Sequence, residues 1–185
     1  MALKATICKA VLQIADMDRN YYHDHALTIA RHPSETDERM MVRILAFALH
    51  ASDTLSFGKG LSTDDEPDLW QKDLTGSIQL WIDAGLPDDK RVRRACGRAN
   101  EVFVYAYGGH GASLWWERIA GDLERTQNLT VKIFAQSSTR ALAALASRNM
   151  QLNCTIQEEQ IWLADEKETV QVEMTAVRTP AATSR

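Results

Sequence analysis

The sequence has few features that would cross-link the chain or hold it in a membrane. It contains three cysteines, Cys8, Cys96 and Cys154, which lie far apart and form no CxxC motif. An odd number of widely spaced cysteines excludes a disulfide framework and gives no indication of a zinc site. No apolar run approaches the roughly 18 residues that span a bilayer, which excludes a membrane protein. The start also lacks the apolar stretch of a secretion signal, so we expect a cytoplasmic protein.

The chain also lacks a large excess of charge of one sign. Its 21 basic and 25 acidic residues leave a net charge of -4. This balance argues against a surface coated by nucleic acid, although a local basic patch remains compatible with it. A length of 185 residues, 45% of them hydrophobic, suits one domain that can bury a core.

No linker rich in proline, glycine or serine divides the chain, and residue periodicity predicts alternating strands and helices. The predicted strands cover residues 3–14, 22–32, 55–61, 67–72, 77–84, 102–107, 129–135, 152–157, 160–164 and 169–177. The predicted helices run from the N-cap Ser34 to about Ala51, from Pro87 onward, and over 113–125 and 138–149. We therefore expect a single α/β domain over residues 1–178, with an N-terminal β-hairpin and one mixed β-sheet flanked by helices. Residues 179–185 are expected to form a flexible tail.

Carboxylates gather around the predicted strand 67–72. Four acids, Asp64, Asp65, Glu66 and Asp68, lie within five residues, and Asp83 lies on the predicted strand 77–84. If residues 73–76 form a hairpin loop, Asp68 lies across from Trp81 and diagonally beside Asp83 on the same face. Two carboxylates at that spacing repel each other, and a hard divalent cation is the simplest compensator.

Glu38 is a third carboxylate that could join this site. On a helical wheel it lies near the centre of the apolar stripe, one turn before Met41, while Arg39, Arg43 and His50 share the opposite face. Either Glu38 points towards the other acids, or the first turn of the helix overhangs the sheet and Glu38 reaches water. The sequence leaves both readings open.

Basic residues gather on the helix that follows Pro87. Lys90, Arg94 and Arg98 recur at four-residue spacing, with Arg91 beside them and Arg93 in the same cluster, opposite the stripe of Val92, Cys96 and Ala99. Such a face could meet phosphates, or it is the solvated side of an amphipathic helix.

Several longer segments resemble the YaeQ family, a group of uncharacterised bacterial proteins, and the resemblance covers almost the whole chain. The segments that carry it are Met1–Ile7, Ala30–Thr36, Glu38–Met41, Asp64–Pro67, Leu80–Asp83, Gly85–Asp88 and Ile161–Leu163. The family looks like a variant of the PD-(D/E)XK nuclease fold, also called restriction-endonuclease-like. The resemblance implies a core of helix, three strands, helix and strand, which is the order predicted above.

The resemblance also implies roles for single residues. The first helix of that fold supplies a glutamate, matched by Glu38 or by Glu35. The second core strand supplies the aspartate of the Pro-Asp pair, matched by Pro67-Asp68 with Asp65 and Glu66 just before it, and the third strand supplies an acid matched by Asp83. Gly85 stands where active members carry a lysine, and Lys72, Lys90 and Arg94 are the candidates to replace that lysine from elsewhere.

Two hypotheses follow from the sequence and the resemblance. In the first, the protein is a Mg²⁺-dependent nuclease that hydrolyses phosphodiesters of DNA or RNA, and Glu38, Asp68 and Asp83 hold the metal. Lys90 then acts in catalysis, and phosphate contacts come from Arg91, Arg94 and Arg98. In the second, the protein does not cleave and binds nucleic acid or a protein partner through the same cleft. A third reading places the function elsewhere, for example on Trp115 and Trp116.

Overall fold

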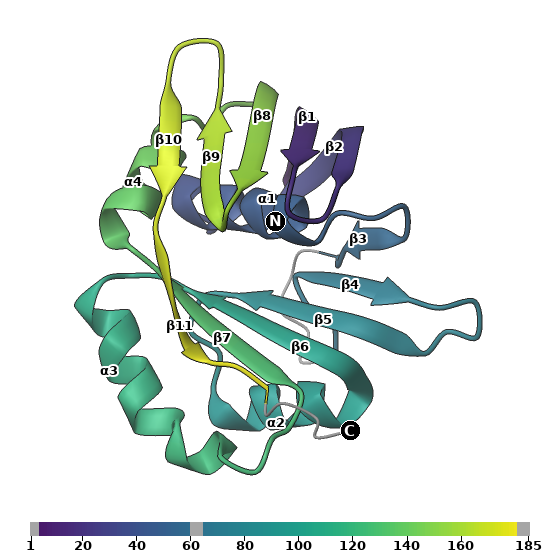
Figure 1. Cartoon of the computed structure of the whole chain (residues 1–185), viewed down its shortest axis with the longest axis vertical. Coiled ribbons are helices and arrows are strands. Elements are labelled where there is room, and N and C mark those ends of the chain that lie inside the picture. Colours follow the sequence, from purple (N-terminus) through teal and green to yellow (C-terminus); the bar gives the residue numbers. More distant parts are fainter. Residues whose placement is uncertain (1–3, 60–64, 181–185) are drawn as a thin grey trace.

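The computed structural model describes residues 4–59 and 65–180, and within them the chain forms two β-sheets and four α-helices (Figure 1). The first sheet has the order β10-β9-β8-β1-β2 and the second the order β11-β7-β6-β5-β4-β3. The first sheet contains β1 (Thr6–Asp16), β2 (Tyr21–Arg31), β8 (Asn149–Gln157), β9 (Gln160–Ala164) and β10 (Thr169–Val172). The second contains β3 (Leu55–Phe57), β4 (Leu69–Lys72), β5 (Ile78–Ala84), β6 (Ala99–Ala106), β7 (Leu129–Phe134) and β11 (Met174–Arg178). The helices are α1 (Asp37–His50), α2 (Asp89–Arg98), α3 (His110–Ile119) and α4 (Gln136–Ala144).

Both sheets are mixed. In the first, β1 runs parallel to β8 and antiparallel to β2. In the second, β5, β6 and β7 run parallel to one another, while β4 and β11 join them antiparallel. The single α/β domain and the N-terminal hairpin of β1 and β2 agree with the prediction. The expectation of one sheet is wrong, because the strand predicted over 169–177 is interrupted at Glu173 into β10 and β11, which belong to different sheets.

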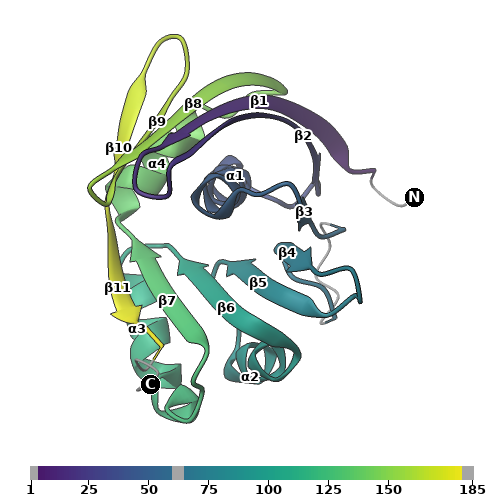
Figure 2. The same cartoon turned by 45° about the vertical axis from the view of Figure 1, so that its right-hand side comes forward.

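Helix α1 lies between the two sheets (Figure 2), and this position explains its composition. Every residue from Met40 to Ala48 is buried, including Arg43. A helix with sheets on two sides has no fully solvated face, so the surface that carries Arg43 and His50 is packed rather than exposed. The inward residues of β1, from Cys8 to Ile14 in alternation, complete this core from above. The second sheet is covered on its other face by α2 and α3, where Trp81, Val92 and Trp115 form a second core.

Several element ends differ from the predictions for local reasons. Helix α1 is capped by Thr36, whose hydroxyl accepts a hydrogen bond from the Arg39 backbone amide at 3.1 Å, and not by Ser34. Helix α4 ends at Ala144 because Leu145 and Ala146 close the last turn with shorter-range hydrogen bonds and β8 begins at Asn149. Strand β3 ends at Phe57, and the last two residues of the strand predicted over 55–61 lie outside the described residues. The same is true of Met1–Leu3, Asp64 and most of the predicted tail.

None of the described helices has both the length and the apolar character required to cross a bilayer.

The ring of His50 is enclosed at the end of α1, where it makes a 2.6 Å hydrogen bond to the hydroxyl of Tyr105 and packs against Phe103. Burial, with smaller contributions from the nearby charges of Arg19 and Lys132, lowers the pKa of His50 from 6.5 to about 3. The neutral ring is therefore part of the folded structure.

The low pKa of His50 predicts a specific loss of stability in acid. Because the unfolded chain binds a proton below about pH 6.5 and the folded chain does not, stability from this group is complete above pH 6.5 and is lost as the pH falls towards 3. We expect His50 to account for about 2 kcal/mol of destabilisation between about pH 7 and pH 5. Urea unfolding of wild type and His50→Gln at both pH values measures it. An equal pH dependence in the two proteins would contradict the prediction.

Candidate functional site

The predicted site residues occupy the region where the start of α1 meets β4 and β5. Glu35, directly before the helix, is buried and receives three hydrogen bonds from arginines of α1. The Nε and Nη2 atoms of Arg43 donate to its two carboxylate oxygens, each at 2.8 Å, and Nη1 of Arg39 donates at 2.9 Å. Arg39 and Arg43 are four positions apart on one face of α1, and Glu35, which precedes the N-cap Thr36, lies at the start of that face. Glu35 is thus a structural anchor for two guanidinium groups.

Asp68 is the second member of this network. Its Oδ1 accepts from Nη2 of Arg39 at 2.6 Å, and its Oδ2 accepts from the backbone amide of Ala84 at 2.7 Å. Arg39 therefore bridges Glu35 and Asp68. Burial lowers the pKa of Arg39, but the two carboxylates outweigh this effect and raise the pKa above its ordinary value. Arg39 stays charged, so the bridge joins α1 to the end of β5.

The predicted pairing of Asp68 is wrong by two residues. Trp70 is the Cα partner of Trp81, and Asp68 lies in a bend just before β4. The difference arises at the hairpin loop, where the Asp73 amide binds the Ser77 carbonyl and the register shifts next to Lys72. A bulge of this kind displaces every pairing beyond it.

Asp83 has a separate set of partners. Arg91 of α2 binds it in a two-pronged manner, with Nη2 at 2.9 Å from Oδ1 and Nε at 3.0 Å from Oδ2. The indole Nε1 of Trp81 donates to Oδ2 at 3.1 Å. The Asp83 side chain is only 3% exposed, and Arg91 also binds the carbonyl of Glu66 at 2.9 Å. Asp83 therefore holds α2 against the sheet.

Glu38 points to a third neighbour. Its Oε1 accepts a 2.6 Å hydrogen bond from the hydroxyl of Thr139 on α4. It is half-buried, so neither of the two readings of the sequence describes it fully. Burial raises the pKa of Tyr107 at the end of β6; Arg39 lowers it, and Glu38 and Asp68 add to the increase. Glu38 and Asp68 are thus both close enough to Tyr107 for their charges to act on it.

These residues do not fit a divalent metal in this arrangement. The oxygens of Asp68 and Asp83 already accept bonds from guanidinium, indole and backbone donors, which compete with a cation for the same lone pairs. Within residues 4–59 and 65–180, no group of three or more His, Cys, Asp or Glu side chains is placed to hold a metal ion. Asp65 is exposed, with Oδ1 3.9 Å from Arg98, and Glu66 lies beside Lys59. Asp64 lies outside the described residues.

The backbone conformation at Gly85 explains why glycine, and not lysine, occupies this position. Its φ of +111° lies in the left-handed region, where side chains are strained, although a Cβ there would meet no atom within 4 Å. The backbone amide of Gly85 donates to the Tyr105 carbonyl at 2.9 Å, which fixes this geometry. The position two residues after Asp83 is therefore shaped for glycine.

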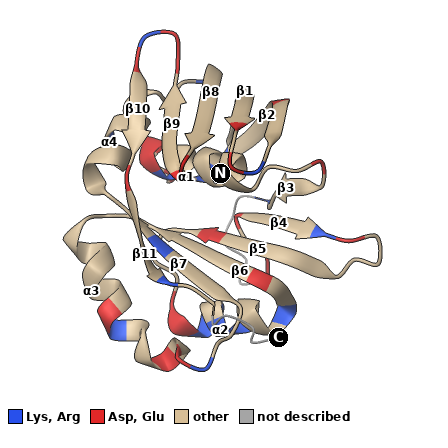
Figure 3. Cartoon of the chain, in the orientation of Figure 1, with Lys and Arg blue, Asp and Glu red and all other residues tan. Residues whose placement is uncertain are grey.

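Basic residues recur along α2, where Figure 3 shows blue segments, and they differ in exposure. Arg91 faces the sheet and binds Asp83, whereas Lys90, Arg93, Arg94 and Arg98 are exposed. Arg93 pairs with Asp89, and the guanidinium of Arg98 lies 5.3 Å from the ring centroid of Trp81. Lys72 lies over Trp70, with its ammonium 3.6 Å from the ring centroid. The solvated face predicted for this helix is present, except for Arg91.

Sequence reasoning did not identify Arg39, Arg43 or Tyr107 as members of this cluster. The repeat of Glu35, Arg39 and Arg43 at four-residue spacing was the available signal. It indicates a row of opposite charges on one side of a helix. The network is buried because Arg43 also contacts β2 through the Ala30 carbonyl and the ring of Phe57 on β3, and a pattern within one helix does not reveal these contacts.

Comparison with known proteins identifies relatives along the whole chain. The family model described as "YaeQ protein" matches residues 1–174. Proteins named "Uncharacterized protein YaeQ" from Salmonella typhi and from Escherichia coli strain K12 are each 44% identical to the chain over 181 residues, covering 98% of this chain and 100% of the relative.

Two crystal structures of YaeQ proteins have the same fold. The protein from Xanthomonas axonopodis pv. citri superposes with a TM-score of 0.91 at 49% identity, covering 95% of this chain and 99% of that one. The protein from Pseudomonas syringae superposes with a TM-score of 0.90 at 32% identity, covering 95% and 97%. With the family model and the relatives in sequence, these structures show that the chain belongs to the YaeQ family.

Proposed function

We propose that this YaeQ-family protein has a PD-(D/E)XK-like core that does not cleave, and that it binds nucleic acid through the outer face of α2. The order α1, β3, β4, β5, α2, β6 supports the nuclease-like core. The observation that carries the proposal is the division of α2 into two faces. Arg91 neutralises Asp83 from inside, while Lys90, Arg94 and Arg98 are exposed outside.

The contacts of the carboxylates favour binding over hydrolysis. A metal shared by Glu38, Asp68 and Asp83 would require these side chains to leave Thr139, Arg39 and Arg91, respectively. Releasing a buried carboxylate from its arginine costs several kcal/mol. Gly85 also leaves the lysine position of active nucleases without a cation, and Lys72 lies over Trp70 instead.

The outer face of α2 has the chemistry of a phosphate contact. Three exposed cations at four-residue spacing follow the helix for two turns and can meet successive phosphates. The net charge of -4 does not oppose this, because phosphate contacts depend on the local field rather than on the total charge. We expect binding without strong sequence preference, since backbone contacts carry no base information.

The proposal predicts salt-dependent binding without cleavage. We expect a labelled DNA duplex, its single strand and the equivalent RNA to remain intact with Mg²⁺ or Mn²⁺, and at least one to bind. In the triple variant Lys90→Ala, Arg94→Ala, Arg98→Ala, affinity falls at least tenfold and the slope of log K against log salt falls by about 2 to 3. Fluorescence anisotropy at several salt concentrations measures both.

A matched control removes three exposed basic residues from elsewhere. Arg140→Ala, Arg148→Ala, Lys167→Ala makes the same change in net charge on another part of the surface. This control should retain most of the affinity. Equal losses in the two triple variants, or no binding by wild type, would contradict the proposed surface. Metal-dependent hydrolysis that disappears in Asp83→Asn would instead establish the nuclease.

A further inference from the structure

A cavity of about 670 Å³ lies between the two sheets, away from α2. It lies beside the end of α1, and its walls come from β7, β9, β10 and β11, from the ends of β1 and β8 and from the loops that follow those two strands. These strands lie at the left of Figure 2. Its volume is in the range of sites for small molecules. The apolar part of the wall includes Ile161 and Val172, which are 2% and 6% exposed, with Leu49 and Met174.

Lys132 of β7 supplies a positive charge to this wall. It is half-buried, and no hydrogen bond or ion pair of its side chain occurs within the described part of the chain. Its Cα partners are Tyr105 of β6 and Ala176 of β11, and Ala176 also lines the cavity. A half-buried ammonium without an anionic partner favours an anion beside it.

The other cation in the wall already has partners. Arg19 donates from Nε to Asp16 at 2.6 Å and from its terminal nitrogens to the carbonyls of Ala48 and Ala51. Two acids of the wall, Asp16 and Asp18, are similarly engaged. Asp18 accepts from the backbone amides of Glu158 and Glu159, both at 2.8 Å, and Glu159 and Glu173 are exposed.

We propose that this cavity binds a small amphiphilic carboxylate, with the carboxylate on Lys132 and the apolar body against Ile161, Val172 and Met174. The ligand class follows from the combination of an apolar wall with Lys132, for which the described residues supply no ion-pair partner. A neutral molecule of the same shape would give Lys132 no opposite charge. The site is separate from the nucleic-acid surface proposed on α2 and does not depend on it.

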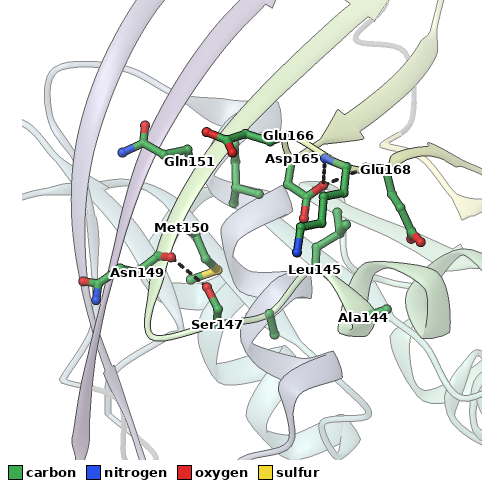
Figure 4. Close-up of a pocket in the computed structure, with 12 residues that line it drawn as sticks. Ala144, Leu145, Ser147, Asn149, Met150, Gln151, Asp165, Glu166 and Glu168 are labelled. Carbon is green, nitrogen blue, oxygen red and sulfur yellow. Dashed lines mark hydrogen bonds between the residues drawn. The ribbon is translucent and has the colours of Figure 1, made fainter.

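A second hollow, of about 510 Å³, serves as an internal control (Figure 4). It lies between the α4–β8 connection and the β9–β10 turn, and it contains Lys167 and Met150. Asp165 in its wall accepts hydrogen bonds from the backbone amides of Lys167 and Glu168, at 2.8 and 2.7 Å. The carboxylate of Asp165 is therefore stabilised by the backbone of its own turn. Lys167 is exposed, unlike Lys132.

Octanoate is the probe for the test, with octanol as its neutral counterpart. We expect octanoate to bind wild type about tenfold more tightly than octanol by calorimetry, a difference that Lys132→Met abolishes and Lys167→Met retains. In NMR spectra of ¹³C-methyl methionine, the Met174 signal should shift on titration while that of Met150 does not. Ala176→Phe, which places a ring in the cavity without changing Lys132, should weaken binding of both probes.

Three results would overturn the proposal. They are equal binding of octanoate and octanol by wild type, unchanged octanoate affinity in Lys132→Met, and a shift of Met150 in place of Met174. The first comparison uses only wild type, so it decides the matter even if a variant does not fold. Loss of nucleic-acid binding in the α2 variant with octanoate binding intact would show that the two sites are independent.

Discussion

Glu35→Ala is expected to lower the free energy of unfolding by about 3–5 kcal/mol, the range for removing one partner of a buried ion pair. The variant leaves Arg43, which is 1% exposed, without its carboxylate, and it also removes the contact to Arg39. In a chain of this size, the expected loss corresponds to roughly 10 °C in Tm. Urea and thermal unfolding followed by circular dichroism measure it.

Asp37→Ala is the matched control for this prediction. Asp37 lies two residues further along and pairs with Arg31 at 2.6 Å, but its side chain is 51% exposed. Exposed pairs contribute about 0–1 kcal/mol, so this variant should be much closer to wild type. Similar losses in the two variants would contradict the buried network. Glu35→Leu combined with Arg43→Met should recover much of the stability, because it removes both charges together.

Asp83→Asn is the second large effect, and it separates an arginine anchor from a metal ligand. As an anchor, Asp83 neutralises Arg91 and receives the Trp81 indole, so we expect a loss of about 3 kcal/mol in unfolding free energy without added metal. If Asp83 were instead one of several metal ligands, these carboxylates would repel one another in the metal-free protein. Neutralising one of them would then raise the free energy of unfolding. The sign of the change therefore distinguishes the two roles.

Chemical unfolding with chelator present measures this effect, and Asp65→Asn provides the control. Asp65 is 83% exposed and 3.9 Å from Arg98, so its substitution should change stability by less than about 1 kcal/mol. If Asp83→Asn were more stable than wild type, the role of Asp83 as an anchor for Arg91 would be contradicted, and a role as a metal ligand would be favoured.

Local sequence predicts the elements better than it predicts their assembly. The positions of β1, β2, β5, β7, β9 and α1 follow from period-two and period-3.6 patterns. The division into two sheets does not, because it depends on which strands pair, and β10 and β11, on either side of Glu173, join different sheets. Both strands have ordinary strand composition, and only their partners, β9 and β7, assign them to different sheets.

The site shows the same limit at the scale of side chains. The sequence places Asp68 and Asp83 near one another, and their neighbourhood at the ends of β4 and β5 agrees with that. It does not reveal that each carboxylate meets an arginine from a different helix, Arg39 from α1 and Arg91 from α2. Those contacts depend on how the helices pack on the sheet, which charge spacing within one helix cannot specify.

The parallel pairing of β1 with β8 has a consequence for how the chain folds during synthesis. Lys9 is the Cα partner of Asn149, so β1, which lies between β2 and β8 in the first sheet, has one neighbour near the start of the chain and another near its end. The hairpin of β1 and β2 can form as soon as it leaves the ribosome, but one edge of β1 stays unpaired until residues 149–157 have been made. Helix α1 likewise remains uncovered on that side. Contacts of such long range slow folding and leave apolar surface exposed in the meantime. We therefore expect the edge of β1 and one side of α1 to stay exposed, and accessible to chaperones, for most of translation.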